Sequence, residues 1–260
     1  MVIRFVISFF VFSGRYFLFG GAGQVSRIVI FDLYDTLLNE ISFDFERGLG
    51  ALYELGFGAV CTRQAFLAYA AAFLPLYEKR KTDNTEVKFL DEYRAYCKRF
   101  RFQPEPAEDD VEYAVMRRMT EVSLSGEVTD TLAALAARNT SMYILTNSIF
   151  SAQANKRLLQ EFGLRRYFQD LYSSADAGMR KPAKAFFDYG IGRILAENPE
   201  TRRGEIDFVG NDYDSDVSGA AAAGLRPVWY RAAGRETGSR RTNAGIRVIE
   251  TFQRLIDIVQ

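Results

Sequence analysis

The stretch Phe31-Asp32-Leu33-Tyr34-Asp35-Thr36-Leu37-Leu38 begins where an apolar run, residues 27–31, meets an acid. β-Branched residues dominate that run, which is typical of a short buried strand. A carboxylate at the end of such a strand lies at the mouth of an open α/β sheet, where these proteins bind ligands. Asp32 is therefore a candidate nucleophile, and the Thr36 hydroxyl is a candidate donor to an anion. From this stretch alone, an Asp32 that merely caps a turn is an equally good interpretation.

Three later segments favour the nucleophile over the turn cap. Residues 143–148, Tyr-Ile-Leu-Thr-Asn-Ser, form a second apolar run that ends in hydroxyl and amide donors. Lys181 lies in the loop Gly-Met-Arg-Lys-Pro, residues 178–182, before a predicted helix. Residues 207–216, Asp-Phe-Val-Gly-Asn-Asp-Tyr-Asp-Ser-Asp, form a third apolar run followed by an acidic loop. In this order and spacing the four segments resemble the four motifs of the haloacid dehalogenase (HAD) superfamily, and the resemblance extends from about Ser26 to the C-terminus.

The pattern of elements predicts an α/β fold, with a Rossmann-like parallel sheet core and an inserted helical cap domain. From Met142 onward, apolar strands alternate with amphipathic helices, which predicts a parallel sheet with right-handed crossovers. Residues 41–126 are charged and helical in pattern, with no convincing strand. Because a structureless loop of this length would be unusual, we interpret the segment as an insert that matches the helical cap of one HAD subclass. The α/β core then comprises residues 25–40 and 127–260.

Residues 1–24 form a hydrophobic N-terminal extension that we interpret as lying upstream of the domain. A membrane-spanning helix needs about 20 predominantly apolar residues, and Arg15 interrupts such a span. A secretory signal or membrane anchor is the alternative, because a short apolar run is followed by small residues. The interpretation as an extension predicts a cytoplasmic protein and argues against membrane association.

The composition excludes several kinds of chemistry. The 260 residues include no histidine, which excludes Ser-His-Asp and Cys-His catalysis and any His-ligated zinc site. The formal net charge is zero, so there is no overall electrostatic attraction to nucleic acid. Basic runs at 79–81 and 98–101 are interpreted as solvated helix faces, not as patches that steer a substrate, because acids lie nearby. Catalysis must therefore rest on carboxylates, hydroxyls, amides and lysine.

The resemblance implies a role for each candidate side chain in the hydrolysis of a small phosphorylated metabolite. Asp32 would attack phosphorus to form an aspartyl-phosphate, while Thr36, Thr146 and Asn147 bind the phosphoryl group. Lys181 would neutralise the charge that develops between nucleophile and phosphate. A hard cation with oxygen ligands, Mg²⁺, would screen the approach of the two anions. The implied ligands are Asp32, the backbone carbonyl of Tyr34, Asp216 and, depending on the spacing chosen, Asn211 or Asp212, with Asp214 facing solvent.

One position departs from the family pattern. HAD phosphatases usually carry a second Asp two positions after the nucleophile, where it protonates the leaving group and later activates water; here that residue is Tyr34. A phenol with a pKa near 10 can donate a proton but is a poor base at neutral pH. Losing a general acid/base lowers the rate by about 10²–10⁴, so activity would survive weakly or with good leaving groups. Asp35 is interpreted as a support of the loop and not as a replacement.

Two other functions remain open. Tyr34 also resembles the residue found at this position in the 2-haloacid dehalogenases of the superfamily, in which Asp attacks carbon and halide leaves without an acid or a metal. The acidic loop fits that alternative less well, because its charges would repel a carboxylate substrate, and Arg47 matches only loosely the arginine that those enzymes use. The third alternative is a non-catalytic binding module that kept the fold and lost the chemistry.

Overall fold

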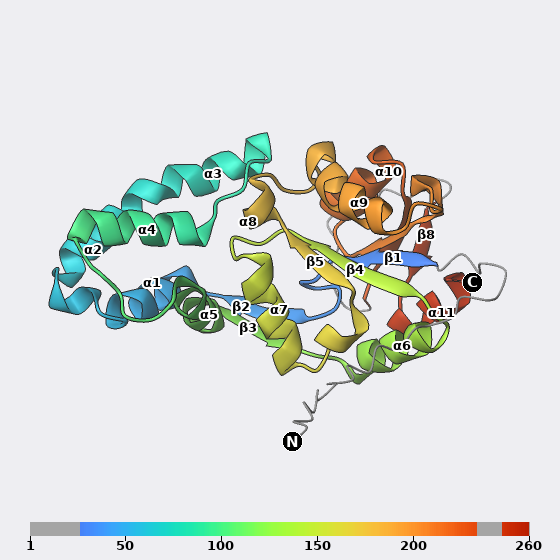
Figure 1. Cartoon of the computed structure of the whole chain (residues 1–260), viewed down its shortest axis with the longest axis horizontal. Coiled ribbons are helices and arrows are strands. Elements are labelled where there is room, and N and C mark those ends of the chain that lie inside the picture. The colour runs from blue at the N-terminus through green and yellow to red at the C-terminus, as the bar shows by residue number, and fades with distance from the viewer. Residues whose placement is uncertain (1–26, 233–245, 260) are drawn as a thin grey trace, which may run out of the picture.

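The computed structural model describes residues 27–232 and 246–259. The predicted N-terminal extension, residues 1–24, lies outside the described residues. Within the described part of the chain, no helix is long and apolar enough to cross a membrane. The chain forms a six-stranded sheet with helices on both faces, and five further helices extend to one side of it (Figure 1).

All strands of the main sheet run parallel, in the order β5-β4-β1-β6-β7-β8. The first strand of the described residues therefore lies inside the sheet, between β4 and β6. This arrangement confirms the predicted α/β fold with a parallel sheet. The bounds of the strands are Ile28–Phe31 (β1), Ser141–Thr146 (β4), Asp170–Ser173 (β5), Asp207–Gly210 (β6), Arg226–Tyr230 (β7) and Arg247–Ile249 (β8).

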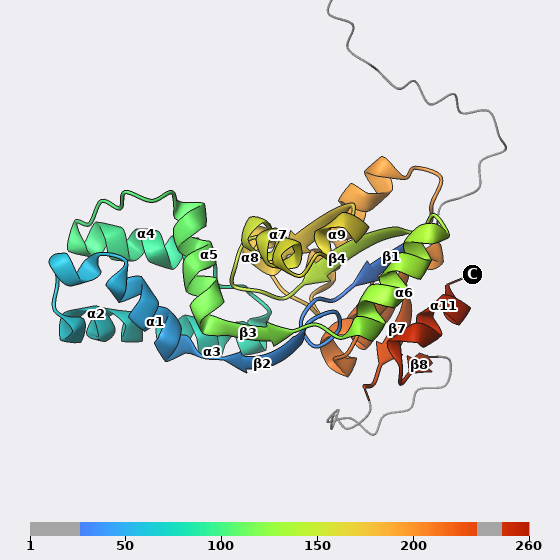
Figure 2. The ribbon, with the colours of Figure 1, turned by 90° about the horizontal axis from the view of Figure 1, so that it is seen from below.

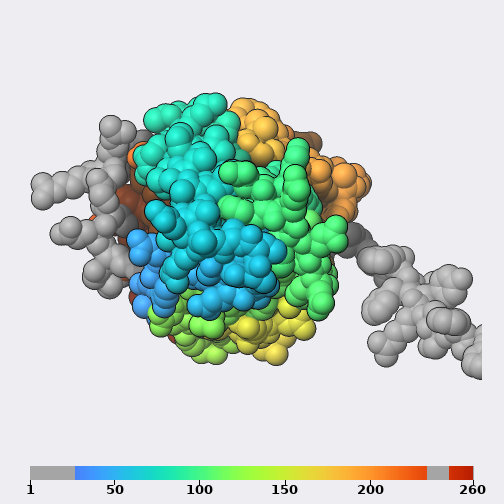
Figure 3. All heavy atoms as spheres, turned by 90° about the vertical axis from the view of Figure 1, so that its left-hand side faces the viewer, coloured from blue at the N-terminus to red at the C-terminus, as the bar shows by residue number. Residues whose placement is uncertain are grey.

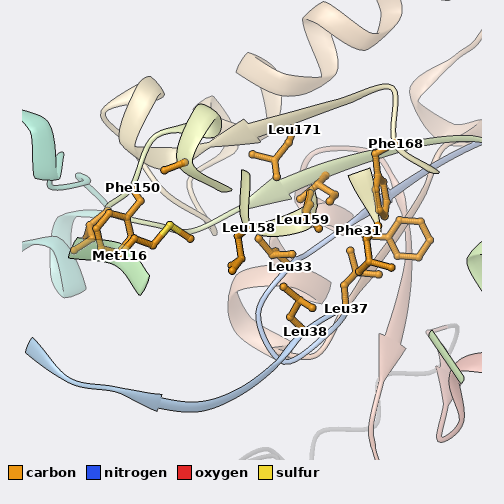
Figure 4. Packing of buried hydrophobic residues seen from close by; sticks show 14 of the residues in the cluster. Phe31, Leu33, Leu37, Leu38, Met116, Phe150, Leu158, Leu159, Phe168 and Leu171 are labelled. Carbon is orange, nitrogen blue, oxygen red and sulfur yellow. The ribbon is translucent and has the colours of Figure 1, made fainter. Parts of the chain in front are cut away.

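Successive residues of β1 face opposite sides of the sheet, as the period of a strand requires. Val29 and Phe31 belong to one apolar cluster, and Ile28 and Ile30 belong to another. Figure 4 shows the first cluster, in which the rings of Phe31 and Phe168 meet edge to face at 6.0 Å. Both faces are buried, which explains the uninterrupted apolar run of β1.

The helices of the core are Gly126–Ala137 (α6), Ala152–Glu161 (α7), Ser174–Ala177 (α8), Lys184–Glu197 (α9), Gly219–Ala222 (α10) and Leu255–Ile258 (α11).

Residues 45–119 form five helices beside the sheet, and we call this segment the helical insert. Aromatic rings fill its interior. The ring of Phe66 stacks on that of Tyr96 with 4.7 Å between ring centroids, and it contacts the ring of Phe57 with 5.3 Å between centroids. Seen from its own end, the insert makes up most of the visible face of the molecule (Figure 3). The helices predicted within residues 41–126 are thus present. They are Phe45–Glu54 (α1), Arg63–Ala70 (α2), Leu74–Asp83 (α3), Phe89–Phe100 (α4) and Glu108–Met119 (α5), with short 3-10 turns at Phe57–Ala59 and Ala71–Phe73.

Two strands that the sequence did not predict join the insert to the core. Asn39–Phe43 (β2) and Thr120–Ser123 (β3) pair antiparallel, and Figure 2 shows them side by side between the helices of the insert and the main sheet. The expectation of no strand in residues 41–126 is therefore wrong. Both strands are short, largely polar and only partly buried, so neither shows the apolar run or the alternation that signals a strand.

Candidate functional site

Three parallel strands bring candidate residues to one edge of the sheet. Asp32 follows β1 directly, Thr146 is the last residue of β4, and Asn211 follows β6. Because β1 lies between β4 and β6, these residues meet at the carboxyl edge of the sheet, where α/β proteins bind ligands. The backbone N–H of Asp32 donates to the carbonyl of Val209 at 2.9 Å, which holds the start of the loop against β6.

Lys181 is the centre of the site. Its Nζ donates to Oδ1 of Asp32 and to Oδ1 of Asp216, at 2.6 Å each, and its side chain is 1% exposed. Burial by itself lowers the pKa of Lys181, but the charges of Asp216 and Asp32 outweigh burial and raise this pKa, so the lysine stays charged. Burial raises the pKa of Asp216, and Lys181 opposes that rise. One ammonium is thus shared by two buried acids, which leaves a negative charge when both acids are ionised.

Thr36 connects Asp32 to the loop after β6. Its Oγ1 lies 3.2 Å from Oδ2 of Asp32 and 3.2 Å from Oδ1 of Asn211. The single hydroxyl proton serves one of these acceptors at a time, so the two acceptor oxygens converge on a small space. We call the five residues joined in this way, Asp32, Thr36, Lys181, Asn211 and Asp216, the Asp32 cluster.

The loop after β6 decides which side chains join the Asp32 cluster. A Cβ at Gly210 would lie 2.4 Å from atoms of the Asp216 side chain, so any larger residue would displace that carboxylate. The side chain of Asp212 is exposed, and its Oδ1 accepts the N–H of Ser215 at 2.7 Å, at the start of the π-helix Tyr213–Ser218 (η5). The contacts therefore bring Asn211 into the cluster and use the Asp212 side chain as a helix cap. Asp214 is exposed, as the sequence analysis expected.

Asn147 and Thr146, at the end of β4, have different surroundings. Oδ1 of Asn147 accepts the N–H of Lys181 at 2.8 Å, and its Nδ2 donates to the Lys181 carbonyl at 3.1 Å. The amide side chain thus positions the backbone of Lys181. The Thr146 hydroxyl is buried and has no hydrogen-bond partner among the described residues. Buried hydroxyls are nearly always paired, so this donor fits an oxygen of a bound anion.

The Tyr34 hydroxyl donates to Oδ1 of Asn155, on α7, at 2.9 Å. Asn155 is fixed in turn by its Nδ2, which donates to the carbonyls of Phe150 and Ser151. Burial, followed by the charge of Glu40, raises the pKa of Tyr34 well above its usual value. The phenol therefore keeps its proton at neutral pH and directs it to an amide oxygen.

Two further residues that the sequence analysis weighed make local contacts. Oδ1 of Asp35 accepts the N–H of Glu40 at 2.9 Å, which is the loop support that we expected. Arg47 is exposed, and its guanidinium donates to Asp44, the N-cap of α1, and to Ser42 of β2. The observed contacts of Arg47 thus do not connect it to the Asp32 cluster.

A cavity of about 270 Å³ lies next to the Asp32 cluster. Arg180, beside Lys181 in the chain, lines it together with residues of the core and of the helical insert. Arg180 and Glu86 were not predicted as site residues, and the prediction that Arg80 lies on a solvated helix face is wrong. Lys79 and Lys81 are exposed as expected, but Arg80 is half-buried and pairs with the buried Glu86 at 2.7 Å. Among the other lining residues are Tyr34, Glu40, Asn147 and Ser148.

The class of protein follows from a comparison with known families. The family described as haloacid dehalogenase-like hydrolase matches residues 27–224. The chain belongs to this family, which makes it a hydrolase and confirms the resemblance noted in its four motifs.

Individual relatives show how widely the family's activities vary. Pyrimidine 5'-nucleotidase YjjG of Escherichia coli (strain K12) is 30% identical over 213 residues, which cover 80% of this chain and 87% of that protein. A solved structure of 2-haloacid dehalogenase from Pseudomonas syringae pv. Tomato DC3000 has a TM-score of 0.58 at 19% identity, covering 90% of this chain and 97% of that one. The crystal structure of a HAD phosphatase from Thermococcus onnurineus has a TM-score of 0.56 at 19% identity. It covers 89% of this chain and 97% of that one. At these identities the two structures establish the fold alone.

Proposed function

We propose that this chain is a Mg²⁺-dependent phosphatase that hydrolyses the phosphate monoester of a small metabolite. The observation that carries the proposal is the Asp32 cluster, in which Lys181 and Thr36 hold a buried carboxylate at the ligand-binding edge of the sheet. The relative that aligns over 87% of its length is named as a nucleotidase, which supports a phosphate monoester as substrate. The cytoplasm remains our predicted location.

In the proposed reaction, a carboxylate oxygen of Asp32 bonds to phosphorus as the bond from phosphorus to the leaving oxygen breaks. The leaving group departs with that electron pair. Water then bonds to phosphorus as the bond between phosphorus and the Asp32 oxygen breaks, which restores the carboxylate and releases phosphate, and the protons of the water end on the phosphate and on the leaving oxygen. Lys181 offsets the negative charge of Asp32 throughout, and its two short hydrogen bonds fix it before the substrate arrives. The Thr146 hydroxyl would donate to a phosphoryl oxygen.

The oxygens of the Asp32 cluster fit a magnesium ion. Two carboxylates and an amide are hard ligands of the kind that Mg²⁺ prefers, and the two acids share a single ammonium. No group of three or more His, Cys, Asp or Glu that could hold a metal occurs in the described part of the chain, so neutral oxygens must complete the site. Asp32, Asp216, Asn211 and the Tyr34 carbonyl would hold the ion. Bound there, Mg²⁺ would screen the negative charges of Asp32 and the phosphate.

We further propose that the helical insert is a cap domain, formed by residues 41–126 over a core of residues 25–40 and 127–260. Arg80 and Glu86 of the insert line the same cavity as Tyr34 and Asn147 of the core. A substrate in this cavity would therefore contact both parts, with its phosphate toward the Asp32 cluster.

Tyr34 favours a second candidate function, the metal-free hydrolysis of a 2-haloacid. A halide ion leaves without a proton, so the reaction would not need the Tyr34 hydroxyl proton, which is donated to Asn155. The structural likeness to a dehalogenase supports the fold of either enzyme equally. The exposed position of Arg47 gives this candidate no support.

The test is hydrolysis of p-nitrophenyl phosphate by the full-length protein, with Mg²⁺ and with EDTA. We expect release of p-nitrophenol that requires Mg²⁺, and we expect Asp32→Asn to lower kcat by about 10³-fold or more with an unchanged circular dichroism spectrum. Asp214→Asn is the matched control, because it removes an exposed acid from the neighbouring loop.

An active Asp32→Asn variant would refute the assignment of the nucleophile. No hydrolysis under either condition, combined with chloride release from 2-chloropropionate, would establish the dehalogenase instead. Inactivity on both substrates would favour the non-catalytic alternative.

A further inference from the structure

Arg80 and Arg180 form a pair of guanidinium groups on one wall of the cavity next to the Asp32 cluster. Arg80 is on α3 of the helical insert, and Arg180 is on the core loop that also carries Lys181. Both contact Glu86, whose side chain is fully buried: Arg80 Nη1 donates to it at 2.7 Å, and Arg180 Nε lies 3.9 Å from it. The two guanidinium groups share Glu86, and Arg80 also interacts with the charge of the buried Glu92.

Glu86 makes its hydrogen bonds to other donors and none to Arg180. Its oxygens already accept the Ser174 hydroxyl at 2.7 Å and the Val87 N–H at 3.0 Å. The 3.9 Å separation from Arg180 is too long for a hydrogen bond. The guanidinium of Arg180 makes no hydrogen bond within residues 27–232 and 246–259, and Nε of Arg80 is buried without a partner there. The pair thus keeps one buried donor without an acceptor, and the partly exposed guanidinium of Arg180 is free to bind a ligand, as this group binds anions through two parallel hydrogen bonds.

Burial makes this state unfavourable for Arg180. Burial lowers the pKa of Arg180, and the nearby charge of Arg80 lowers it further. The charges of Glu86 and, more weakly, Asp212 raise this pKa, but they do not cancel the effect of burial. Glu40 also lines the cavity, and burial, followed by the charge of Asp35, raises its pKa. An anionic ligand would supply the charge and the acceptors that this wall lacks.

We propose that Arg80 and Arg180 bind a second anionic group of the substrate, separate from the phosphate that is cleaved. The substrate class is then a compact phosphate monoester that also carries a carboxylate or a second phosphate. The cavity volume of about 270 Å³ is slightly below the usual range for small-molecule sites, roughly 300–1,000 Å³, which favours a compact ligand. The inference rests on the proposed phosphatase function and narrows its substrate.

The test compares 3-phosphoglycerate with glycerol 3-phosphate, which has a neutral hydroxymethyl group in place of the carboxylate. Binding is measured by calorimetry with Mg²⁺ on full-length Asp32→Asn protein, so that no turnover is required. We expect 3-phosphoglycerate to bind about tenfold more tightly or better, and we expect Arg180→Gln in the same background to remove most of that preference. Lys79→Gln is the matched control, because it removes an exposed charge from the helix that carries Arg80.

Equal affinity for the two ligands, or a preference that survives Arg180→Gln, would overturn the subsite. Arg80→Gln provides a second variant that must also reduce the preference. Hydrolysis of p-nitrophenyl phosphate by the unmodified protein tests the phosphatase separately, because this compound has no second anion. Turnover of p-nitrophenyl phosphate without a binding preference would support the phosphatase and refute the subsite. A binding preference without turnover would support the subsite and refute the phosphatase.

Discussion

Tyr34 occupies the position where the HAD phosphatase pattern has an acid, and its surroundings suppress both halves of acid–base catalysis. Its raised pKa prevents it from acting as a base, and its hydroxyl proton is directed to Asn155. An ester with a stable leaving anion, such as p-nitrophenolate, needs little protonation in the first step. An alkyl ester needs more, so we expect the two kinds of substrate to differ strongly in rate.

Two substitutions at Tyr34 test this expectation. Because the hydroxyl binds Asn155, we expect Tyr34→Phe to lower kcat on p-nitrophenyl phosphate by no more than about threefold. Tyr34→Asp restores a carboxylate and should raise kcat on glycerol 3-phosphate by about tenfold or more relative to p-nitrophenyl phosphate. Steady-state kinetics on both substrates gives the comparison. A fall of about 10²-fold in Tyr34→Phe would instead identify Tyr34 as the proton donor.

Single residues were predictable where the strand pattern fixed their place. Asp32 and Thr146 could be placed because each ends an apolar run, and such runs end at the same edge of a parallel sheet. The choice between Asn211 and Asp212 was not predictable, because it depends on which side chain caps η5. Arg80 was beyond prediction as well, since its neighbours Lys79 and Lys81 are exposed and its partner Glu86 is buried only through tertiary packing.

The turn from β6 into η5 divides two adjacent polar residues between two tasks. Asn211 faces Thr36 and the Asp32 cluster, while Asp212 caps the helix. Losing an amide ligand should weaken a metal site, whereas losing a helix cap should weaken the fold.

The pair of variants Asn211→Ala and Asp212→Ala separates these tasks. We expect Asn211→Ala to raise the Mg²⁺ concentration needed for half-maximal activity by about tenfold or more. Asp212→Ala should leave that concentration nearly unchanged and lower the free energy of unfolding by about 1 kcal/mol. Magnesium titrations of activity and urea denaturation measure the two effects. The opposite pattern would show that Asp212 is the ligand.

Elements were predictable in proportion to their apolar content. The central strands β1, β4 and β6 each contain a run of apolar residues that is buried on both faces, and the sequence shows these runs directly. β2 and β3 are polar, and each is stabilised by a partner far away in the sequence. No local pattern carries that information, so the connection between core and insert could be learned only from the structure.

On the scale of the whole molecule, one apolar cluster extends from the sheet into the helical insert. Phe89, at the start of α4, packs its ring on Phe150 of the core at 5.6 Å, and its N–H donates to the carbonyl of Ile149 at 2.9 Å. Because the cluster is continuous, we expect the core and the insert to unfold in a single transition.

Glu92, inside the insert, should make the stability of this unit depend on pH. Burial raises the pKa of Glu92 to about 7, while Tyr77 and Arg80 oppose the rise; the unfolded value is about 4.3. Between these values the native state binds more protons than the unfolded state. Stability is therefore greatest below the unfolded pKa and falls as the pH rises toward 7.

Replacing Glu92 by glutamine should remove this dependence. We expect Glu92→Gln to raise the free energy of unfolding at pH 8 by about 2–4 kcal/mol and to flatten its fall between pH 5 and 7. Urea denaturation over that pH range provides the measurement, and Glu105→Gln, which changes an exposed acid, is the control. An equal effect in both variants would mean that net charge, and not burial, governs the response.

The antiparallel pair of strands β2 and β3, which joins the insert to the core, affects how hydrolases of this family can evolve. Asn39 lies opposite Ser123, and Phe43 lies opposite Thr120, so the chain leaves the sheet and returns to it at neighbouring points. A module inserted between two paired strands can be lengthened, shortened or exchanged during evolution without rethreading the rest of the polypeptide. The same two junctions would let an engineer transplant the insert of a relative onto this core, exchanging the insert's side of the cavity while Asp32 and Lys181 stay in place.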